Sequence, residues 1–350
     1  MQEILQKFSA TLREASAKRT PVRIRGSGSK DFYGQALIGE VLDTRAYTGI
    51  VDYEPTELVI TACAGTPLRI VETALADKGQ MLAFEPAHFG SDATLGGCVA
   101  SGFSGPRRAY SGSVRDFVLG VRLLNGLGED LRFGGQVMKN VAGYDVSRLV
   151  TASFGTLGLL AEISLKVLPL PKAERTLQFS IEEAAALERI NRWAAQPLPL
   201  SASCHVDGRL YVRLSGAAPA VDSAARKLGG ETMNDGAPFW ASIREHQHRF
   251  FAGDSSVWRM SVKSTAPPLA LGPQLSEWNG SLRWILAGHD APRMHEAAAA
   301  SGGHATLFRG ADKRHGIQRL SPGAIVLHRK LKHAFDPAGI LCPGRLHPDF

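Results

Sequence analysis

The fold is decided by one glycine-rich stretch, EPAHFGSDATLGGCVASGFSGPRRAYSGSVRDFVLG (85–120). Seven of its 36 residues are glycine, and many of the positions between them hold small Ser, Thr or Ala side chains. Such a segment has little side-chain volume with which to build a core. A backbone moulded around a large flat ligand explains this composition better than loops without a function. Within it, TLGG (94–97) places a threonine and two glycines at an expected helix N-terminus, where backbone N–H groups favour an anion.

A loop of similar character lies near the start of the chain, in RIRGSGSK (23–30). A strand that runs into G-S-G-S points consecutive backbone N–H groups at one spot, which suits a pyrophosphate. The loop lacks the GK[ST] of a Walker motif, and it lacks the third glycine of the dinucleotide fingerprint. Taken alone, it indicates an ordinary turn. A third segment, KNVAGYDVSRLVTASFGTLGLLAEISLKVLP (139–169), adds Gly143-Tyr144-Asp145 before a short helix and ends in a long strand.

In this order, the three segments resemble the FAD-binding domain of the p-cresol methylhydroxylase (PCMH) and vanillyl-alcohol oxidase superfamily. The resemblance implies an α+β fold, with a two-part PCMH-type FAD-binding domain followed by a smaller ferredoxin-like α+β cap domain. The run from TLGG to NVAGYD and the tail FDPAGILCPGR (335–345) are also similar to the E-subunit family of bacterial glycolate oxidases. The resemblance covers about 20–170 and the last 15 residues, and it is thin over 175–320.

Periodicity and turn residues predict the elements of the first domain. Helices are predicted over 3–18, over a segment that begins with Thr66 as N-cap and ends at about 78, and over 145–152 with Asp145 as its cap. Strands are predicted over 21–25, 57–65, 81–86, 117–125, 131–135 and 157–170. Pro169 and Pro171 mark the expected boundary, so we predict an FAD-binding domain over 1–172, a cap over 173–335 and a tail over 336–350 that returns to the first domain. Strands and helices alternate in the cap, which predicts an antiparallel sheet with helices on one face.

The resemblance implies roles for individual residues. Backbone N–H groups of the first loop would bind the FAD pyrophosphate, from Gly26, Ser27, Gly28 and Ser29. The TLGG segment would close round the pyrophosphate and flavin from the other side, through Thr94, Gly96 and Gly97. Gly102 and Ser113 lie where the family's chain passes close to the cofactor, and Ile163 would face the adenine through its backbone. Lys30 would neutralise phosphate, or would be a solvated lysine after a turn.

The chain also departs from its relatives. Relatives with covalent FAD often carry His at the fifth place of RGSGS, where this chain has Ser29, so we expect non-covalent FAD. The HGDGN-type cluster of full-length hydroxy-acid dehydrogenases is missing, and the residues in the comparable stretch do not match it: His304, Arg309, Lys313, Arg314 and His315. Cys342-Pro343-Gly344 stands where many relatives have Asn-Pro-Gly.

Oxidation of a 2-hydroxy acid by flavin needs a base for the hydroxyl proton and a cation, usually Arg, for the carboxylate. No base–Arg pair can be identified from spacing, and the catalytic residues stay unassigned. The histidines considered as a base, each more often a surface or packed residue, are His205, His246, His248, His289 and His304. Arg107 and Arg108 could clamp an anion, or they form a solvated pair or a partner contact.

Composition narrows the function classes. Lys plus Arg minus Asp plus Glu is 40 − 33 = +7, which indicates a solvated surface or a basic face for anionic lipid, an anionic substrate or an acidic partner subunit. No basic helix with interleaved aromatics supports nucleic-acid binding. The four cysteines are far apart and form no C-x-x-C, so we expect no metal site: Cys63, Cys98, Cys204 and Cys342. The first residues contain no apolar secretory segment, so we expect a cytoplasmic protein, with a peripheral contact at the inner membrane permitted.

The resemblance implies an FAD-dependent oxidoreductase subunit that acts on the CH–OH group of 2-hydroxy acids. It would oxidise glycolate to glyoxylate within a multi-subunit glycolate oxidase or dehydrogenase. Its electrons would pass to a second FAD-linked subunit and an iron–sulfur subunit. Two alternatives stay open, a freestanding FAD-dependent 2-hydroxy-acid or alcohol oxidoreductase, and a mainly structural assembly subunit.

Overall fold

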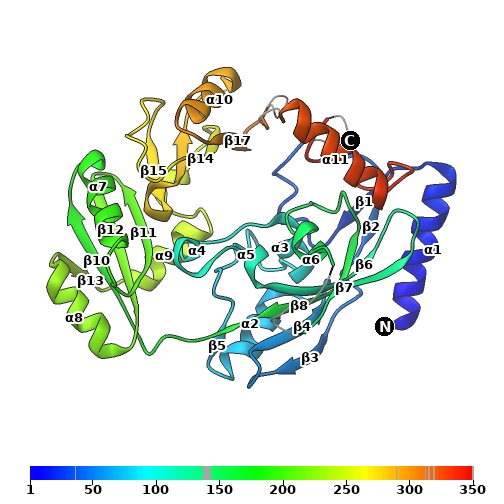
Figure 1. The fold of residues 1–350 in the computed structure, drawn as a ribbon, viewed down its shortest axis with the longest axis horizontal. Helices are drawn as coiled ribbons and strands as arrows, with labels where there is room; N and C mark the ends of the chain where they lie inside the picture. The colour runs from blue at the N-terminus through cyan, green and yellow to red at the C-terminus, as the bar shows by residue number, and fades with distance from the viewer. Residues whose placement is uncertain are drawn as a thin grey trace. The chain divides into compact units, whose positions relative to one another are not determined.

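The computed structural model describes the chain apart from residues 36, 137–142, 289, 312, 314–315, 318–319 and 349–350. The chain divides into two units (Figure 1). Unit 1 comprises Met1–Phe103, Ser113–Pro169 and Arg319–Phe350, and unit 2 comprises Ser104–Gly112 and Leu170–Gln318. The predicted boundaries differ from these units in two places: the helix over 322–335, predicted as the end of the cap, belongs to unit 1, and Ser104–Gly112, predicted as part of the first domain, belongs to unit 2. For Ser104–Gly112 the difference has a local cause, because Tyr110 packs against a core of unit 2 and the Trp278 indole N–H donates to the Gly105 carbonyl oxygen at 3.0 Å.

Unit 1 is built on a five-stranded antiparallel sheet in the order β3-β4-β8-β6-β7. Its strands are β3 (Ile50–Glu54), β4 (Val59–Cys63), β6 (Val118–Leu124), β7 (Asp130–Gly134) and β8 (Leu159–Lys166). The central strand β8 is almost wholly buried, as its run of Leu, Ile and Ala predicts. Two separate clusters of buried side chains flank the sheet. One gathers α2 (Leu68–Ala76) and α3 (Leu95–Ser101), and the other gathers α1 (Gln2–Lys18).

Two small sheets complete unit 1. The parallel pair β1 (Val22–Arg25) and β2 (Glu40–Asp43) is extended by a parallel bridge from Val22 to Leu341 of the C-terminal tail. The antiparallel pair is β5 (Gln80–Met81) with β9 (Leu168–Pro169). The expected strand over 81–86 was therefore wrong beyond Met81, because the chain turns there and the Glu85 N–H donates to the Leu82 carbonyl oxygen at 3.0 Å. The remaining helices are short except the last: α4 (Arg108–Ser111, in unit 2), α5 (Val114–Phe117), α6 (Val146–Leu149) and α11 (Pro322–Phe335).

The expected N-cap of α2 was also wrong. Its N-cap is Pro67, which makes no side-chain hydrogen bond. The Thr66 hydroxyl instead bonds to the backbone of Gly49, accepting from its N–H at 2.9 Å and donating to its carbonyl oxygen at 3.1 Å. A long-range contact thus displaced the local capping role that the Thr-Pro pair predicted.

Unit 2 contains one eight-stranded sheet in the order β13-β10-β12-β11-β15-β16-β14-β17, with every pair antiparallel. The strands are β10 (Ala173–Ser180), β11 (Leu200–Val206), β12 (Arg209–Gly216), β13 (Glu231–Met233), β14 (Val257–Ser261), β15 (Gln274–Glu277), β16 (Leu282–Leu286) and β17 (His304–Arg309). Numbered within each half, both halves have the strand order 4-1-3-2 of a ferredoxin-like sheet. The cap therefore contains the expected ferredoxin-like arrangement twice, although the sequence shows no repeat.

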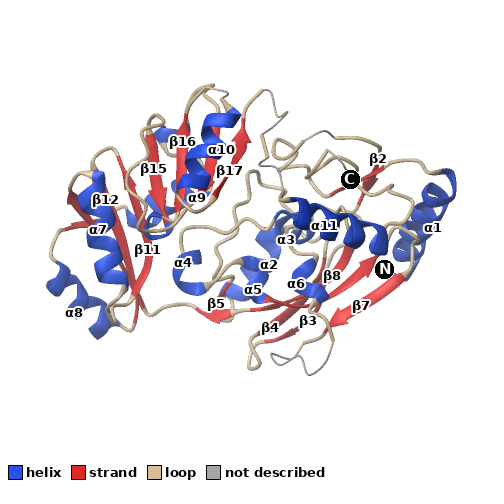
Figure 2. Cartoon of the chain, turned by 45° about the horizontal axis from the view of Figure 1, so that its top comes forward, coloured by secondary structure: helices blue, strands red, loops and turns tan. Residues whose placement is uncertain are grey.

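Helices cover both faces of this sheet. α7 (Glu183–Ala194), α8 (Ala218–Leu228) and α10 (Ala291–Ala300) pack on the face that carries Leu210 and Met260 (Figure 2). The helix α9 (Gly236–Arg244) packs on the opposite face, where the Trp240 indole N–H donates to the Thr176 hydroxyl at 2.9 Å. The prediction of helices on one face was therefore incomplete, because α9 covers the other face.

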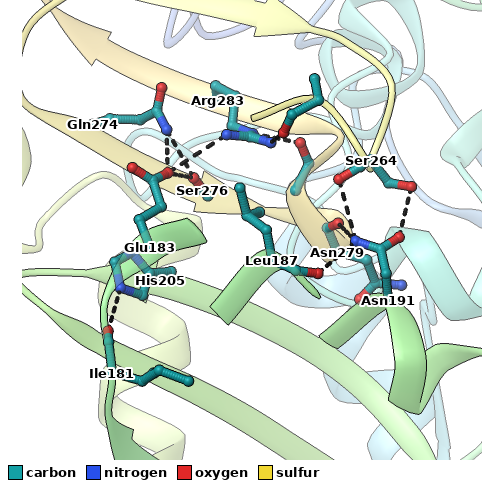
Figure 3. Close-up of polar contacts among 12 residues, drawn as sticks. Ile181, Glu183, Leu187, Asn191, His205, Ser264, Gln274, Ser276, Asn279 and Arg283 are labelled. Atoms are coloured by element: carbon teal, nitrogen blue, oxygen red, sulfur yellow. Dashed lines mark hydrogen bonds and ion pairs between the residues drawn. The ribbon is translucent and has the colours of Figure 1, made fainter. Parts of the chain in front are cut away.

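A buried polar network attaches α7 to the sheet (Figure 3). His205, Ser276 and Arg283 are direct partners across β11, β15 and β16, so their side chains form one row on the α7 face. Arg283 is 0% exposed and lies 3.5 Å from the Glu183 carboxylate of α7, which also accepts from the Ser276 hydroxyl at 2.7 Å. Arg283 further donates to two backbone carbonyl oxygens, those of Gly280 at 2.5 Å and Ala266 at 2.9 Å.

Candidate cofactor site

The two predicted glycine-rich segments meet in unit 1. The loop after β1 approaches the start of α3 so closely that a Cβ atom on Gly26 would lie 2.4 Å from the Thr94 Oγ1. Gly28 has φ +79°, a left-handed conformation that glycine adopts without strain. Thr94 is the N-cap of α3, and its hydroxyl accepts from the Gly97 N–H at 3.2 Å. Glycine is therefore needed both for the close approach and for the turn.

A cavity with a volume of about 100 Å³ lies between the loop and the helix. Eight of the eleven predicted FAD-binding residues line it: Gly26, Ser27, Gly28, Ser29, Lys30, Thr94, Gly96 and Gly97. The structure thus brings together the residues that the sequence assigned to the pyrophosphate.

The three other predicted residues lie outside this lining. Gly102 ends α3 at φ 69°, where a Cβ atom would lie 2.4 Å from the Cβ of Ala152. Ser113 is the N-cap of α5 and donates to the Asp116 carboxylate at 2.8 Å. Ile163 is fully buried in β8 and pairs with β4 on one side and with β6 on the other. Their contacts with FAD stay predictions.

The cavity is lined by cations. Arg23, Arg25, Lys30 and Arg345 contribute to it, with Asp31 paired to Arg25 at 3.0 Å. Lys30 is 8% exposed, so the alternative of a solvated lysine is wrong; its ammonium group donates to the His88 carbonyl oxygen at 3.1 Å and to the Ser29 hydroxyl at 3.2 Å. An excess of positive charge in a partly enclosed site favours a polyanion such as a pyrophosphate.

Sequence reasoning missed three of these cations. Arg23 and Arg25 alternate along β1 immediately before the loop, and this period of two was the available signal. Arg345 comes from the tail motif CPGR, and it donates to the carbonyl oxygens of Lys30 at 3.1 Å and Gln35 at 3.2 Å. Cys342 also lines the cavity, and burial raises the pKa of its thiol.

The donors present fit a bound pyrophosphate. The Arg23 Nε is buried and has no hydrogen-bond partner among the described residues, so an anionic group in the cavity would satisfy it. The first N–H groups of α3 already have partners within unit 1: Leu95 donates to the Thr66 carbonyl oxygen at 2.9 Å, Gly96 to the Ala64 carbonyl oxygen at 2.7 Å and Gly97 to the Thr94 hydroxyl at 3.2 Å. The fit therefore rests on the side-chain cations, whose positive charge an uncharged or cationic ligand would not balance.

None of the described residues considered for catalysis lines this cavity. His205 bonds to the Ile181 carbonyl oxygen at 3.0 Å, and His246 stacks on Phe251 with ring centroids 4.0 Å apart. Burial lowers the pKa of His246 to about 3, so it is neutral at physiological pH. His248 accepts from the Phe250 N–H, and His304 begins β17, where burial lowers its pKa.

The two arginines of the glycine-rich stretch have different surroundings. Arg107 is buried and forms an ion pair with Glu174, so it is not a solvated residue. The Arg108 guanidinium lies 4.4 Å from the centroid of the Trp278 ring, within unit 2. His289, Arg314 and His315 lie outside the described residues. Among the described residues there is no group of three potential metal ligands, and none of the described helices is long and apolar enough to cross a membrane.

Comparison with known proteins decides the family. Residues 5–134 match the model of the FAD binding domain family. The chain is 48% identical over 337 residues to the glycolate oxidase subunit GlcE of Escherichia coli (strain K12), and the match covers 96% of this chain and 95% of that protein. The chain belongs to the GlcE family. As a GlcE-family protein it uses FAD as its cofactor, and the α+β fold expected from the sequence is confirmed.

More distant relatives share part of this GlcE-family chain. The glycolate oxidase subunit GlcD of Bacillus subtilis (strain 168) is 31% identical over 196 residues, which covers 55% of this chain and 42% of that protein. A D-lactate dehydrogenase of Archaeoglobus fulgidus is 30% identical over 166 residues, covering 47% of this chain and 37% of that protein. A solved structure of alkyldihydroxyacetonephosphate synthase has a TM-score of 0.64 at 16% identity, covering 97% of this chain and 74% of that one, and shows the shared fold.

Proposed function

We propose that this chain is the FAD-carrying subunit of a multi-subunit glycolate oxidase or dehydrogenase, which oxidises glycolate to glyoxylate. The observation that carries the proposal is the cation-lined cavity between the first loop and α3, in a chain that is 48% identical to a glycolate oxidase subunit over nearly its whole length. A chain that had lost its use for flavin would have no need to preserve this cavity, which argues against a purely structural assembly subunit.

The chain's own residues would hold the cofactor in two ways. Backbone N–H groups of Ser27 to Ser29 would bind the pyrophosphate against the wall formed by Thr94, Gly96 and Gly97, and Lys30 and Arg23 would balance its charge. Ser29 has no imidazole with which to form a covalent link, so the FAD is bound non-covalently. The bound flavin would supply a two-electron acceptor for oxidation of the alcohol. Gly102, Ser113 and Ile163 are proposed to contact the rest of the cofactor.

We assign the iron–sulfur centre of the proposed complex to another subunit. The four cysteines of this chain are buried in four different places, β4, α3, β11 and the tail, and no two of them are near in sequence. A second FAD-linked subunit would be the other electron partner. The complex would be cytoplasmic, and any membrane contact would be peripheral and made through the assembled complex.

The visible spectrum of the purified chain tests the proposal. We expect oxidised flavin bands that persist when glycolate or D-lactate is added without air, and that bleach once the partner subunits are supplied. Bands that bleach when substrate alone is added to the isolated chain without air, together with steady reduction of an artificial electron acceptor in a separate assay, would instead establish a freestanding oxidoreductase. A chain purified without flavin, and unable to take up added FAD, would overturn the proposal in favour of an assembly subunit.

A further inference from the structure

The positive charge of the chain is concentrated in one segment. Residues 313–335 contain six Lys and Arg and three His but no Asp or Glu, while the whole chain has a net charge of only +7. Most of this segment is the helix α11, PGAIVLHRKLKHAF. On the helix itself the exposed Lys and Arg residues are Arg329 and Lys330, with no Asp or Glu in the helix, and this excess of basic residues favours an anionic partner.

The outer face of α11 combines this charge with exposed apolar side chains. Val326 is 49% exposed and Leu327 is 62% exposed, although both are large aliphatic residues. Lys330 and His333 follow Val326 at helical spacings of four and seven, so they lie on the same face and are also exposed. Exposed apolar side chains that share a helix face with a lysine and a histidine combine the apolar and polar groups found at protein contact surfaces.

The inner face fixes α11 to unit 1. Lys332 is buried and donates to the carbonyl oxygens of Thr156 at 2.9 Å and Leu341 at 2.7 Å, and it forms an ion pair with Asp336 at 2.7 Å. Figure 2 shows α11 as a regular helix of unit 1. The outer face is therefore presented by a rigid element, which lowers the entropic cost of binding.

A groove lies beside the C-terminal half of the helix. Its volume is about 430 Å³, and its lining includes Arg329, Lys332, His333 and Asp336 from the helix and its C-terminal end and Pro337, Pro343 and Pro348 from the tail. The Asp336 carboxylate is paired with Lys332, so the excess charge of the lining is positive. Because the groove is concave and combines basic and apolar walls, it suits a protruding acidic segment rather than a flat surface.

We propose that the outer face of α11 and this groove form a docking surface for an acidic contact surface on another subunit of the complex. The inference rests on the proposed function, because it supplies the contact that such a complex requires. Charge complementarity selects an acidic partner. A protein is favoured over an anionic bilayer because two exposed aliphatic side chains are few for insertion of a helix into lipid, and a bilayer does not fill a groove.

The test compares binding by two charge-reversal variants of the full chain. L327E/K330E changes the outer face of α11, and the matched control L127E/K78E makes the same exchanges at exposed positions elsewhere in unit 1. Each FAD-loaded protein is titrated with the purified second flavoprotein subunit and with the purified iron–sulfur subunit, at two salt concentrations. The same proteins are tested for sedimentation with vesicles of neutral lipid and with vesicles that also contain anionic phosphatidylserine, as a cytoplasmic leaflet does.

We expect the wild-type chain and the control to bind a subunit with an affinity that falls as salt rises, and L327E/K330E to bind at least about tenfold more weakly. Equal binding by L327E/K330E and the control would overturn the docking surface. Loss of vesicle binding with retained subunit binding would do the same and would make α11 a lipid contact. A wild-type chain that binds neither subunit would overturn the proposed function itself, and FAD content, measured alongside, confirms that each variant is folded.

Discussion

The Lys332 ammonium group lies 2.7 Å from the Asp336 carboxylate, and both side chains are buried inside unit 1. Asp336 also accepts from the backbone N–H groups of Ile340 at 3.1 Å and Leu341 at 2.7 Å. Leu341 in turn forms a bridge to Val22, the first residue of β1, and β1 leads directly into the first loop. A single ion pair therefore holds together the last helix, the tail and the edge of the cofactor cavity.

Lys332→Met should weaken both the fold and the cofactor site. It leaves Asp336 buried without its cation, which costs about 3–5 kcal/mol in the free energy of unfolding. The tail residues Cys342 and Arg345 would then lose their fixed position, so we also expect a lower FAD content. Chemical denaturation and the flavin absorbance of the purified protein measure the two effects. Lys330→Met, on the exposed face of the same helix, should change neither the free energy of unfolding nor the FAD content. A K332M protein as stable as wild type would show that the Lys332–Asp336 ion pair does not hold the helix and the tail together.

Gly97→Asp should abolish FAD binding while Gly97→Ala should spare it. A Cβ atom at this position lies 3.2 Å from the Thr94 Oγ1 and meets nothing else within 4 Å, so the alanine requires only a small adjustment. The aspartate adds a carboxylate beside the pyrophosphate, and repulsion of about 3 kcal/mol at roughly 5 Å weakens binding more than a hundredfold. Gly28→Asp should also abolish binding, and it strains the turn as well, because φ is +79° and the added Cβ would lie 2.3 Å from the Arg25 guanidinium. Fluorescence titration with FAD gives the affinities, and stoichiometric FAD in either aspartate variant would show that the site lies elsewhere.

Arg283→Met should destabilise unit 2 without affecting flavin binding by unit 1. It removes the donor from two backbone carbonyl oxygens and leaves Glu183 without its cation, so we expect a loss of about 3–5 kcal/mol. Glu183→Gln keeps an acceptor for Ser276 and should cost less. A double-mutant cycle in urea unfolding should give a coupling energy of about 1–3 kcal/mol. A coupling energy of zero would mean that the buried pair contributes no attraction.

Acidification should destabilise the chain through His246. Its pKa is lowered from 6.5 to about 3 by burial, so the unfolded chain binds a proton between these values while the folded chain does not. The contribution of His246 to the free energy of unfolding is therefore complete above pH 6.5. It decreases as the pH falls, by about 2 kcal/mol at pH 5. His246→Phe keeps a flat ring against Phe251 and should reduce the slope of unfolding free energy against pH. Parallel slopes for the two proteins over pH 4–7 would show that other groups dominate.

Local patterns in the sequence predicted the strongly periodic elements well. The run LGLLAEISLK predicted the central strand of unit 1. Ser321-Pro322 predicted the start of α11, where the Ser321 hydroxyl accepts from the Ala324 N–H at 3.4 Å. Predictions failed where distant residues compete with local ones. Thr66 bonds to Gly49 rather than capping its own helix. Ser104–Gly112 packs in unit 2 because Trp278 bonds to Gly105 and Tyr110 packs against a hydrophobic core of that unit.

The residues of the cofactor site likewise include some that local sequence indicates and others that depend on distant parts of the chain. The glycines of RGSGS and TLGG could be assigned through the resemblance of their motifs to a known family, and the structure gives a physical reason for glycine at Gly26, where the chain approaches Thr94 closely, and at Gly28, where φ is positive. The cations Arg23, Arg25 and Arg345 could not be ranked above other arginines, since their position in the cavity depends on the pairing of β1 and on the return of the tail. An arginine or lysine in the sequence can be assigned to a binding site only once the backbone around it is known.

The cavity is lined by residues from Arg23 to Arg345, which are 322 positions apart in the chain. During synthesis, the glycine loop and α3 leave the ribosome long before Cys342 and Arg345 do. Until those last residues emerge, Val22 of β1 is paired with Glu40 of β2 but lacks its second partner, Leu341, and the cavity lacks the side chains of Cys342 and Arg345. We therefore expect FAD to be loaded only after the tail has been synthesised, so a nascent chain stalled inside unit 2 should not retain FAD.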